Sequence, residues 1–185
     1  PTLGLPLGLL SIAAVLKNSS FEVSIFDTLI SEKSRIKNID EVIHHGVDEE
    51  EFRETLLREA PDIIGIGTLF TAQIPGLIDA AKLTRRILPS SVIVVGGPHF
   101  SVKNETFLKA HQEVDYIISG EGEFSFLELV KALSTQKPID KIAGLTFRHK
   151  NESGENKIII NPPKSVEELD ELPLPAYELI DMDLF

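Results

Sequence analysis

Apolar and polar positions follow one another along this chain in two rhythms, one typical of helices and one typical of strands. Residues 8–18 (GLLSIAAVLKN) are apolar at helical spacing, and residues 21–27 (FEVSIFD) alternate residue by residue, as a strand does. A second helix is predicted over residues 47–60, with only a short helix indicated before it, around residues 39–45. The first third of the chain therefore predicts helix, strand and helix in succession.

The middle of the chain repeats a strand–helix unit three times with short connections. The predicted strands are residues 62–67, 92–97 and 115–120, and the predicted helices are residues 71–88, 104–111 and 122–134. These strands are apolar nearly throughout, which is typical of a parallel sheet that helices cover on both faces. The pattern predicts an α/β fold with a Rossmann-like (flavodoxin-like), doubly wound parallel sheet.

Near the C-terminus the pattern changes. Residues 142–149 and 157–163 are strand-like and flank a polar segment, which predicts a β-hairpin. Residues 165–185 carry closely spaced prolines without a clear period, and we interpret them as a linker. We therefore expect two parts, an α/β domain over residues 1–135 and a β-hairpin extension with a linker over residues 136–185.

Composition narrows the possible functions. With 29 acidic and 18 basic residues the formal net charge is -11, which argues against nucleic acid and anionic membrane surfaces as partners. The 185 residues include no cysteine, so the chain itself forms no disulfide, thiolate metal site or cysteine nucleophile. No run without charged residues is longer than 16 residues, which is shorter than a membrane span, and the apolar run at residues 3–16 lacks the features of a signal peptide. We expect a cytoplasmic protein.

Three consecutive predicted strands end in glycine-rich segments, GTLFT (67–71), GGPHF (96–100) and SGEGE (119–123). In an open α/β sheet, ligands bind beyond the carboxyl ends of the strands, and glycine lets a ligand approach the backbone closely. Each segment alone is typical of a tight turn, but three of them at one edge favour a ligand site. The sequence lacks the G-x-G-x-x-G, G-K-[ST] and G-x-S-x-G patterns of dinucleotide sites, P-loops and hydrolase nucleophiles.

Two kinds of side chain at this edge carry candidate chemistry. His99 is the only histidine in these three glycine-rich segments, and we interpret this lone residue as a hydrogen-bonding group of the loop. No H-x-x-x-H or H-x-H spacing occurs, so no protein-built metal site is expected. Glu121 and Glu123 begin the last helix, where either both complement the helix dipole or Glu121 accepts hydrogen bonds from amide groups of a ligand. Both alternatives stay open.

A family resemblance adds to this interpretation. The segments that carry it are PLGLLSIAAVL, PDIIGIGTLFT, VIVVGGPHFS, DYIISGEGEFSFLELV and ELPLPAYELID. In this order they resemble the N-terminal cobalamin-binding domain of cobalamin-dependent radical S-adenosylmethionine enzymes, a family of methylases and of the anaerobic magnesium-protoporphyrin IX monomethyl ester cyclase type. The resemblance covers nearly the whole chain, with GGPHFS and GEGE as its most specific parts. It implies a sheet of the cobalamin-binding-domain type, with cobalamin as the cofactor.

The resemblance also implies how the cobalt is held. The domain is similar to that of methionine synthase, in which a D-x-H-x-x-G segment presents a histidine to cobalt. Here Gly8 falls on the glycine of that segment, Leu5 on the histidine and Leu3 on the aspartate. The resemblance therefore implies base-off cobalamin without a histidine as lower ligand, with Leu5 shielding that face from water.

The remaining site residues are also implied by the resemblance. The full set of cofactor-binding residues is Leu5, Pro6, Leu7, Gly8, Gly67, Thr68, Leu69, Phe70, Thr71, Gly96, Gly97, Pro98, His99, Gly120, Glu121 and Gly122. Residues 67–69 match an S-x-L segment beside which the dimethylbenzimidazole tail runs, and because Gly67 replaces the serine, a hydroxyl contact would come from Thr68 or Thr71. The glycine pair at 96–97 would leave room for the tail. Residues 98–99 and 120–122 would line the rim around the corrin amides and the nucleotide.

Two features depart from the family pattern. The chain starts within the P-x-L-G-L loop, so we expect further residues upstream that supply the first strand of the sheet. The C-x-x-x-C-x-x-C segment that holds a 4Fe–4S cluster is absent, so this chain alone cannot perform the radical reaction. The cluster and S-adenosylmethionine would belong to a downstream radical domain of the same polypeptide. The full-length protein would then be a methyltransferase or a cyclase.

Two other functions stay possible at this point. The first is a cofactor-free scaffold or interaction domain with the same fold. Bulky side chains between Gly67 and Gly96 would favour it, whereas an open slot there would favour cobalamin. The second is a receiver-like regulatory domain, which would need an acidic pocket that the sequence does not show.

Overall fold

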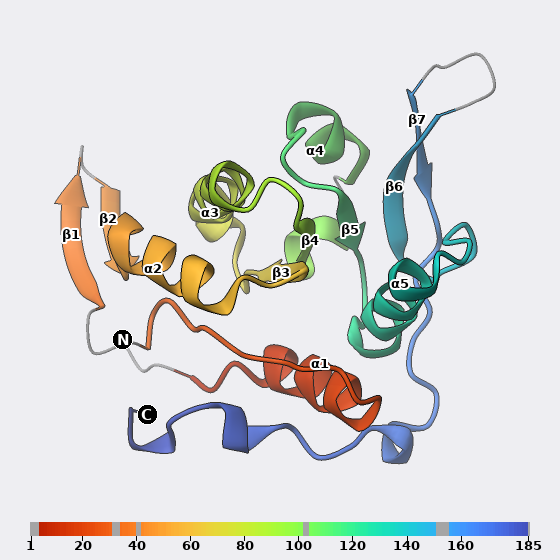
Figure 1. Cartoon of the computed structure of the whole chain (residues 1–185), viewed down its shortest axis with the longest axis horizontal. Coiled ribbons are helices and arrows are strands. Elements are labelled where there is room, and N and C mark those ends of the chain that lie inside the picture. The colour runs from red at the N-terminus through yellow and green to blue at the C-terminus, as the bar shows by residue number, and fades with distance from the viewer. Residues whose placement is uncertain (1–3, 31–33, 40–41, 102–103, 151–155, 185) are drawn as a thin grey trace. The chain divides into compact units, whose positions relative to one another are not determined.

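The computed structural model describes residues 4–30, 34–39, 42–101, 104–150 and 156–184. The chain divides into two compact units. The first comprises Pro1–Ala60 with Pro173–Phe185, and the second comprises Pro61–Leu172. Each unit has a core of its own, and the second contains the large sheet (Figure 1).

Five strands form the sheet of the second unit. They are β3 (Ile63–Gly67), β4 (Val92–Gly96), β5 (Tyr116–Ile118), β6 (Leu145–Lys150) and β7 (Asn156–Ile160), and they lie in this order across the sheet. β3, β4 and β5 are parallel, whereas β6 pairs antiparallel with β5 and β7 pairs antiparallel with β6. The predicted α/β sheet is confirmed, and the predicted hairpin continues the same sheet.

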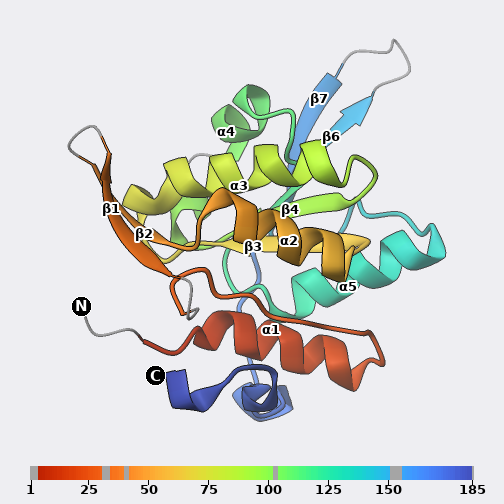
Figure 2. The ribbon, with the colours of Figure 1, turned by 60° about the vertical axis from the view of Figure 1, so that its left-hand side comes forward.

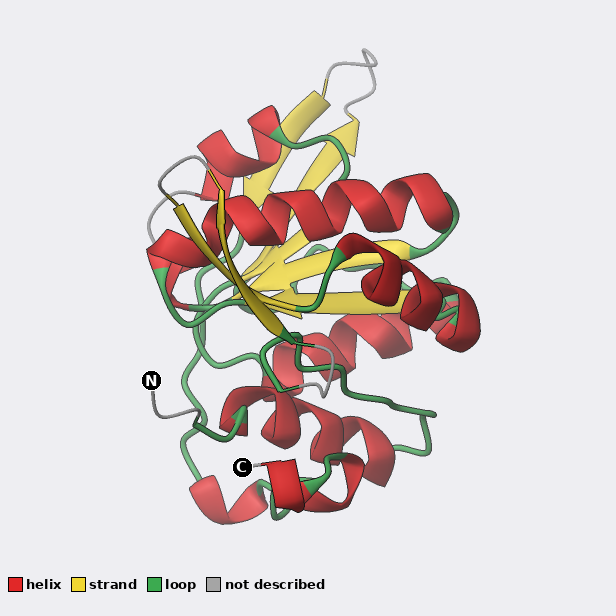
Figure 3. Cartoon of the chain, turned by 90° about the vertical axis from the view of Figure 1, so that its left-hand side faces the viewer, coloured by secondary structure: helices red, strands yellow, loops and turns green. Residues whose placement is uncertain are grey.

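Helices cover both faces of this sheet. They are α3 (Ile74–Ile87), α4 (Asn104–Ala110) and α5 (Glu123–Thr135), with short 3-10 turns η1 (Thr71–Gln73) and η2 (Pro98–Ser101) after β3 and β4. Figures 2 and 3 show α3 and α5 on opposite sides of the strands. Alternation along β4 produces this arrangement, because Ile93 and Val95 pack with α3 and α4 while Val94 packs with α5.

Arg148 on β6 fastens the end of α4 to the sheet. Its guanidinium donates hydrogen bonds to the carbonyl oxygens of Val114 at 2.6 Å, Leu108 at 2.5 Å and His111 at 2.8 Å. Burial lowers the pKa of Arg148 from its ordinary value, and the negative charge of Asp115 opposes that shift. A planar group with five N–H donors serves three carbonyls at once, which a lysine ammonium matches poorly.

Replacing this residue is expected to destabilise the second unit. Arg148→Met keeps an apolar stem but removes a donor from three carbonyl groups, of which only that of His111 keeps another among the described residues, the Val114 N–H. We therefore expect the free energy of unfolding to fall by about 2 kcal/mol. Urea denaturation followed by circular dichroism measures the change. Lys157→Met, on the neighbouring strand and exposed, is the control and should change stability little. Equal stability of the two variants would contradict the proposed role of Arg148.

The first unit is built on two helices and a small hairpin. Its elements are α1 (Leu7–Asn18), β1 (Arg35–Ile39), β2 (Val42–Gly46), α2 (Glu49–Glu59) and the 3-10 turns η4 (Tyr177–Leu179) and η5 (Met182–Leu184). The C-terminal residues run along α1 (Figure 1), where Ala176 N–H donates to the Leu10 carbonyl at 3.1 Å. Lys17 and Glu178 add an exposed ion pair at 2.5 Å. None of the helices in the described part of the chain has the length and apolar character needed to cross a bilayer.

Two predictions in this unit were wrong. Residues 21–27 form no strand, because no backbone ladder pairs with them among the described residues, although Val23 and Ile25 still pack inward against Ala13 and Ala14. The short helix expected around residues 39–45 is replaced by the antiparallel pair β1 and β2. β-branched residues at positions 39, 42 and 43 suit a strand better than a helix.

Candidate functional site

The glycine-rich segments predicted at the strand ends meet at one edge of the sheet. Gly67 at the end of β3 is in register with Gly96 at the end of β4, and Gly96 is in register with Ile118 at the end of β5. The three loops that follow therefore leave the sheet side by side. This is the carboxyl edge, where open α/β sheets bind ligands.

A strip of bare backbone lies on the α5 face of this edge. Gly65, Gly67 and Gly96 form it, and strand alternation places them on the same face as Val94 and Ile63, which pack with α5. Gly65 and Gly67 are exposed. A Cβ built on Gly96 would have only the Ile118 carbonyl oxygen within 4 Å, at 3.4 Å, so no described side chain fills that position. We call these three residues the glycine strip.

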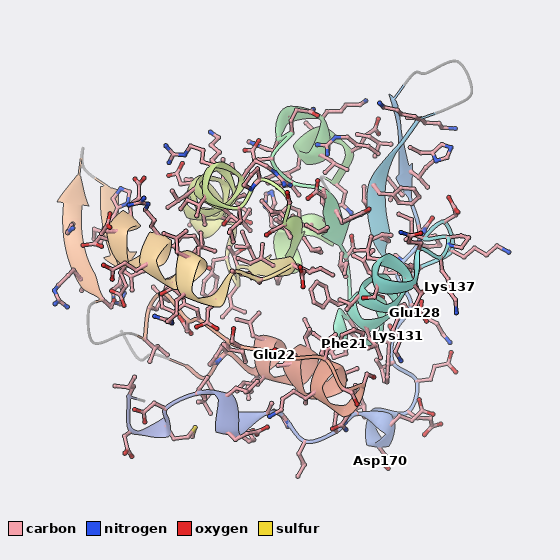
Figure 4. The ribbon with its side chains drawn as sticks, viewed as in Figure 1. Phe21, Glu22, Glu128, Lys131, Lys137 and Asp170 are labelled. Carbon is pink, nitrogen blue, oxygen red and sulfur yellow. The ribbon has the colours of Figure 1, made fainter. Side chains whose placement is uncertain are left out.

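Phe126 on α5 borders the glycine strip. Its Cζ and Cε2 atoms lie 3.3 and 3.6 Å from the position that a Cβ at Gly65 would take. Glu128 and Lys131, labelled in Figure 4, lie on the exposed side of the same helix. Neither Gly65 nor Phe126 was among the site residues predicted from the sequence. The i, i+2 spacing of glycines in GIG could have identified Gly65, whereas no local signal identifies Phe126.

Gly97 has a different role from its neighbour Gly96. Its φ of +117° is unfavourable for any residue with a side chain, and a Cβ there would overlap the carbonyl oxygen of Thr68. The loops after β3 and β4 are therefore packed backbone to backbone. The fold itself requires glycine at position 97, so the missing side chain there is no evidence for a ligand.

The loop after β3 presents two hydroxyl groups and two apolar side chains. The Thr68 hydroxyl oxygen is buried and has no hydrogen-bond partner among the described residues. The Thr71 hydroxyl lies 3.2 Å from Nδ1 of His99. Leu69 and Phe70 are 70% and 65% exposed. Of the two threonines predicted to supply a hydroxyl contact, Thr68 is the one whose hydroxyl the described residues leave unpaired.

The loop after β4 places His99 at the rim. Pro98 and His99 lie in η2, and the His99 ring meets the buried Phe100 ring edge to face at 5.3 Å between centroids. Together with the contact to Thr71, this fastens the histidine between two loops of the same edge. The structure thus brings together Thr71 and His99, which the sequence placed in separate segments.

The loop after β5 holds the predicted glutamate pair. Glu121 accepts a hydrogen bond from the backbone N–H of Val166, so it anchors the segment beyond β7. Neither alternative considered for Glu121 anticipated this contact. Glu123, in the first turn of α5, has a buried carboxylate oxygen without a partner among the described residues. Gly122 precedes α5 as its N-cap, and Gly120 has a φ of +77°.

Buried hydrogen bonds link these loops to one another and to the rest of the second unit. Asn104 Nδ2 donates to the hydroxyl oxygens of Ser119 at 2.6 Å and Thr146 at 3.2 Å, and the Ser119 hydroxyl donates to the Phe100 carbonyl at 3.0 Å. These bonds join α4, β6 and the loops after β4 and β5. Buried, paired polar groups of this kind fix one arrangement of a loop because breaking them costs free energy.

The residues predicted as the face beneath cobalt lie in the first unit. Pro6 is the N-cap of α1, and the Leu7 N–H donates to the Leu5 carbonyl at 2.8 Å. Leu5 and Pro6 are half-buried, whereas Leu7 and Gly8 are exposed. Leu3, which the resemblance sets at the aspartate position, lies outside the described residues.

Known proteins are similar to this chain in sequence. The chain is 31% identical over its full length to the uncharacterized methyltransferase PH0819 of Pyrococcus horikoshii, covering 36% of that protein. It is 26% identical to the anaerobic magnesium-protoporphyrin IX monomethyl ester cyclase of Synechocystis sp., covering 96% of this chain and 32% of the cyclase. The chain therefore spans about a third of the length of these relatives.

Among solved structures, the fold is similar to that of OxsB, a cobalamin-dependent S-adenosylmethionine radical enzyme, in its form with aqua-cobalamin and S-adenosylmethionine bound. The TM-score is 0.71 at 24% identity, and the match covers 97% of this chain and 22% of OxsB. The B12 binding domain family model matches residues 1–130. With its sheet, its glycine-rich carboxyl edge and these relatives, the chain belongs to the B12-binding domain family.

Proposed function

We propose that this chain binds cobalamin and lays the nucleotide tail of the cofactor on the glycine strip. The observation that carries the proposal is the absence of side chains at Gly65, Gly67 and Gly96 on one face of the carboxyl edge. Three glycines on adjacent strands cost conformational entropy and forgo apolar burial, so a bound group on that surface explains them better than turn formation does.

The surrounding residues fit such a cofactor. The unpaired, buried hydroxyl of Thr68 lies in the residue after Gly67 and supplies a hydrogen-bonding group for the tail. The exposed Leu69 and Phe70 add apolar surface next to it. The rim loops with His99 and with residues 120–122 would hold the corrin amides. When bound, cobalamin supplies methyl- or electron-transfer chemistry at cobalt, and the protein supplies binding and orientation.

We further propose that the cofactor is held base-off, without a histidine as lower ligand. Leu5 stands where the resemblance sets that histidine, and an aliphatic side chain can exclude water from a metal but cannot coordinate it. His99 is the histidine at this edge of the second unit, and its Nδ1 lies 3.2 Å from the Thr71 hydroxyl. That contact supports a role in hydrogen bonding at the rim.

Within a longer polypeptide, this chain would be the cobalamin-binding part of a radical S-adenosylmethionine enzyme. Relatives named as a methyltransferase and as a cyclase support methyl transfer or oxidative cyclisation as the reaction of the whole protein. These 185 residues include no cysteine, so a 4Fe–4S cluster would have to be held by other residues, and we propose that a downstream radical domain of the same polypeptide holds it together with S-adenosylmethionine.

A direct test is to incubate the 185-residue chain with hydroxocobalamin, remove the excess by gel filtration and record the visible spectrum. We expect the protein fraction to retain corrinoid at about one per chain, since each chain has one glycine strip. After reduction to the cobalt(II) form, electron paramagnetic resonance should show no splitting from an axial nitrogen. A folded chain that retains no corrinoid would contradict cobalamin binding. Nitrogen splitting, whether from a histidine or from the benzimidazole of the cofactor, would contradict only the base-off arrangement without a histidine ligand.

The open position at Gly96 also bears on the cofactor-free scaffold considered above. That alternative predicts bulky side chains between β3 and β4 at the carboxyl edge. No described side chain lies within 4 Å of a Cβ built at Gly96, which favours the cobalamin proposal. For the receiver-like alternative, no group of three or more metal-ligating side chains occurs in the part of the chain that the structure describes.

A further inference from the structure

We infer that Phe126 closes the inner end of the glycine strip and contacts the base of the nucleotide tail. This inference rests on the proposed cobalamin binding. It assigns to one aromatic residue the recognition of the tail, as distinct from recognition of the corrin ring.

The position of the ring follows from the strand register. Along β3 the bare positions are Gly67 at the edge and Gly65 two residues deeper. Gly67 pairs with Gly96, but Gly65 pairs with Val94, which is only 2% exposed. At the carboxyl edge, therefore, both strands lack a side chain on this face, whereas two residues deeper only β3 does. The glycine strip ends where the Phe126 ring lies against Gly65, at 3.3 Å from its Cβ position.

Phe126 lies at the margin of its hydrophobic cluster. It is one of the hydrophobic residues that pack against the α5-side core while remaining half-buried. Its backbone N–H donates to the Gly122 carbonyl at 2.8 Å, so the ring belongs to the first turn of α5, directly after the loop that follows β5. The rim loop and the end of the strip are thus linked through one helical turn.

The chemistry of the tail fits an aromatic wall. A nucleotide base is a flat heteroaromatic ring, and flat rings pack well on glycine backbone because no Cβ keeps them away. A phenyl ring at the end of that surface offers edge-to-face or offset-stacked contact, the two geometries that aromatic pairs prefer. A bound base that reached Gly65 would meet Phe126 and would not meet the polar groups of the rim.

The test compares two corrinoids that differ only in the tail. Hydroxocobalamin carries the nucleotide, and aquacobinamide has the same corrin ring without it. For Phe126→Ala we expect hydroxocobalamin to bind about tenfold more weakly, because an aromatic contact and its buried area are lost. The affinity for aquacobinamide should stay within about twofold of the original protein. Absorbance titration measures both affinities.

A matched control separates packing from recognition. Leu133 lies seven residues further along α5, on the same helical face, and packs against the same core as Phe126. Leu133→Ala should lower stability without changing the ratio of the two affinities. Phe126→Leu keeps most of the apolar volume, so this variant should fold even if Phe126→Ala does not. Its preference for hydroxocobalamin over aquacobinamide should still be smaller than that of the original protein.

The outcomes distinguish this inference from the proposed function. If the original chain binds neither corrinoid, the proposed function fails and the inference falls with it. If the original chain binds hydroxocobalamin but Phe126→Ala and Phe126→Leu weaken both corrinoids equally, or neither, the inference alone is overturned. A loss confined to hydroxocobalamin supports it.

Discussion

Replacing Gly96 with valine is expected to abolish cobalamin binding while the chain still folds. A Cβ at this position meets only the Ile118 carbonyl oxygen, at 3.4 Å, which is ordinary van der Waals contact. Valine also suits a strand, so we expect the free energy of unfolding to change by no more than about 1 kcal/mol. The added isopropyl group would instead occupy the surface proposed for the nucleotide tail.

The expected loss of affinity for hydroxocobalamin is about 100-fold or more, or about 2.7 kcal/mol, because a close-packed interface cannot absorb a branched side chain. Gel filtration after incubation, followed by absorbance of the protein fraction, measures it. Gly76→Ala is the control, since no described atom outside the adjoining turns of α3 lies within 4 Å of a Cβ at Gly76. Retained corrinoid in Gly96→Val at the original level would show that the tail does not lie on this glycine.

Replacing the next residue, Gly97, with alanine is expected to cause a large loss of stability, which Gly96→Val should not cause. Gly97 has a φ of +117°, which residues with a Cβ rarely adopt, and the new methyl group would overlap the Thr68 carbonyl oxygen. Either the loop after β3 or the turn after β4 must move. We expect the free energy of unfolding to fall by about 3 kcal/mol, the sum of backbone strain and steric overlap.

Urea denaturation measures this change, and Gly96→Ala is the matched control because it adds the same methyl group one residue earlier, where there is space. The control should stay within about 1 kcal/mol of the original protein. If Gly97→Ala were as stable as Gly96→Ala, the backbone packing between Thr68 and Gly97 would not be what requires the glycine.

Gly96 and Gly97 are adjacent in the sequence, but the two predictions give them different roles. In the motif GGPHF both glycines were interpreted as making room for a cofactor tail. The structure gives Gly97 a sufficient reason within the protein, while Gly96 faces a surface free of described side chains. Gly96 therefore supports a bound ligand, together with Gly65 and Gly67, which share its face.

The contacts of Glu121 and Thr71 show a similar limit of sequence reasoning. Glu121 accepts its hydrogen bond from Val166, 45 positions away, and Thr71 meets His99, 28 positions away. No local pattern encodes such contacts, because they depend on how two loops leave the same edge. The same holds for Phe126, which reaches Gly65 only because α5 packs on that face of the sheet.

By itself, the sequence determined the strands and helices between residues 61 and 160, the α/β class and the glycine-rich edge. Those features follow from local periodicity and from the steric freedom of glycine, which act over a few residues. The tertiary structure alone decided that residues 21–27 are not a strand, because a strand needs a partner for its backbone groups. It also decided that a Cβ at Gly96 would meet no other described side chain, whereas a Cβ at Gly97 would overlap the protein's own backbone. That distinction depends on atoms far apart in the chain, which only packing brings together.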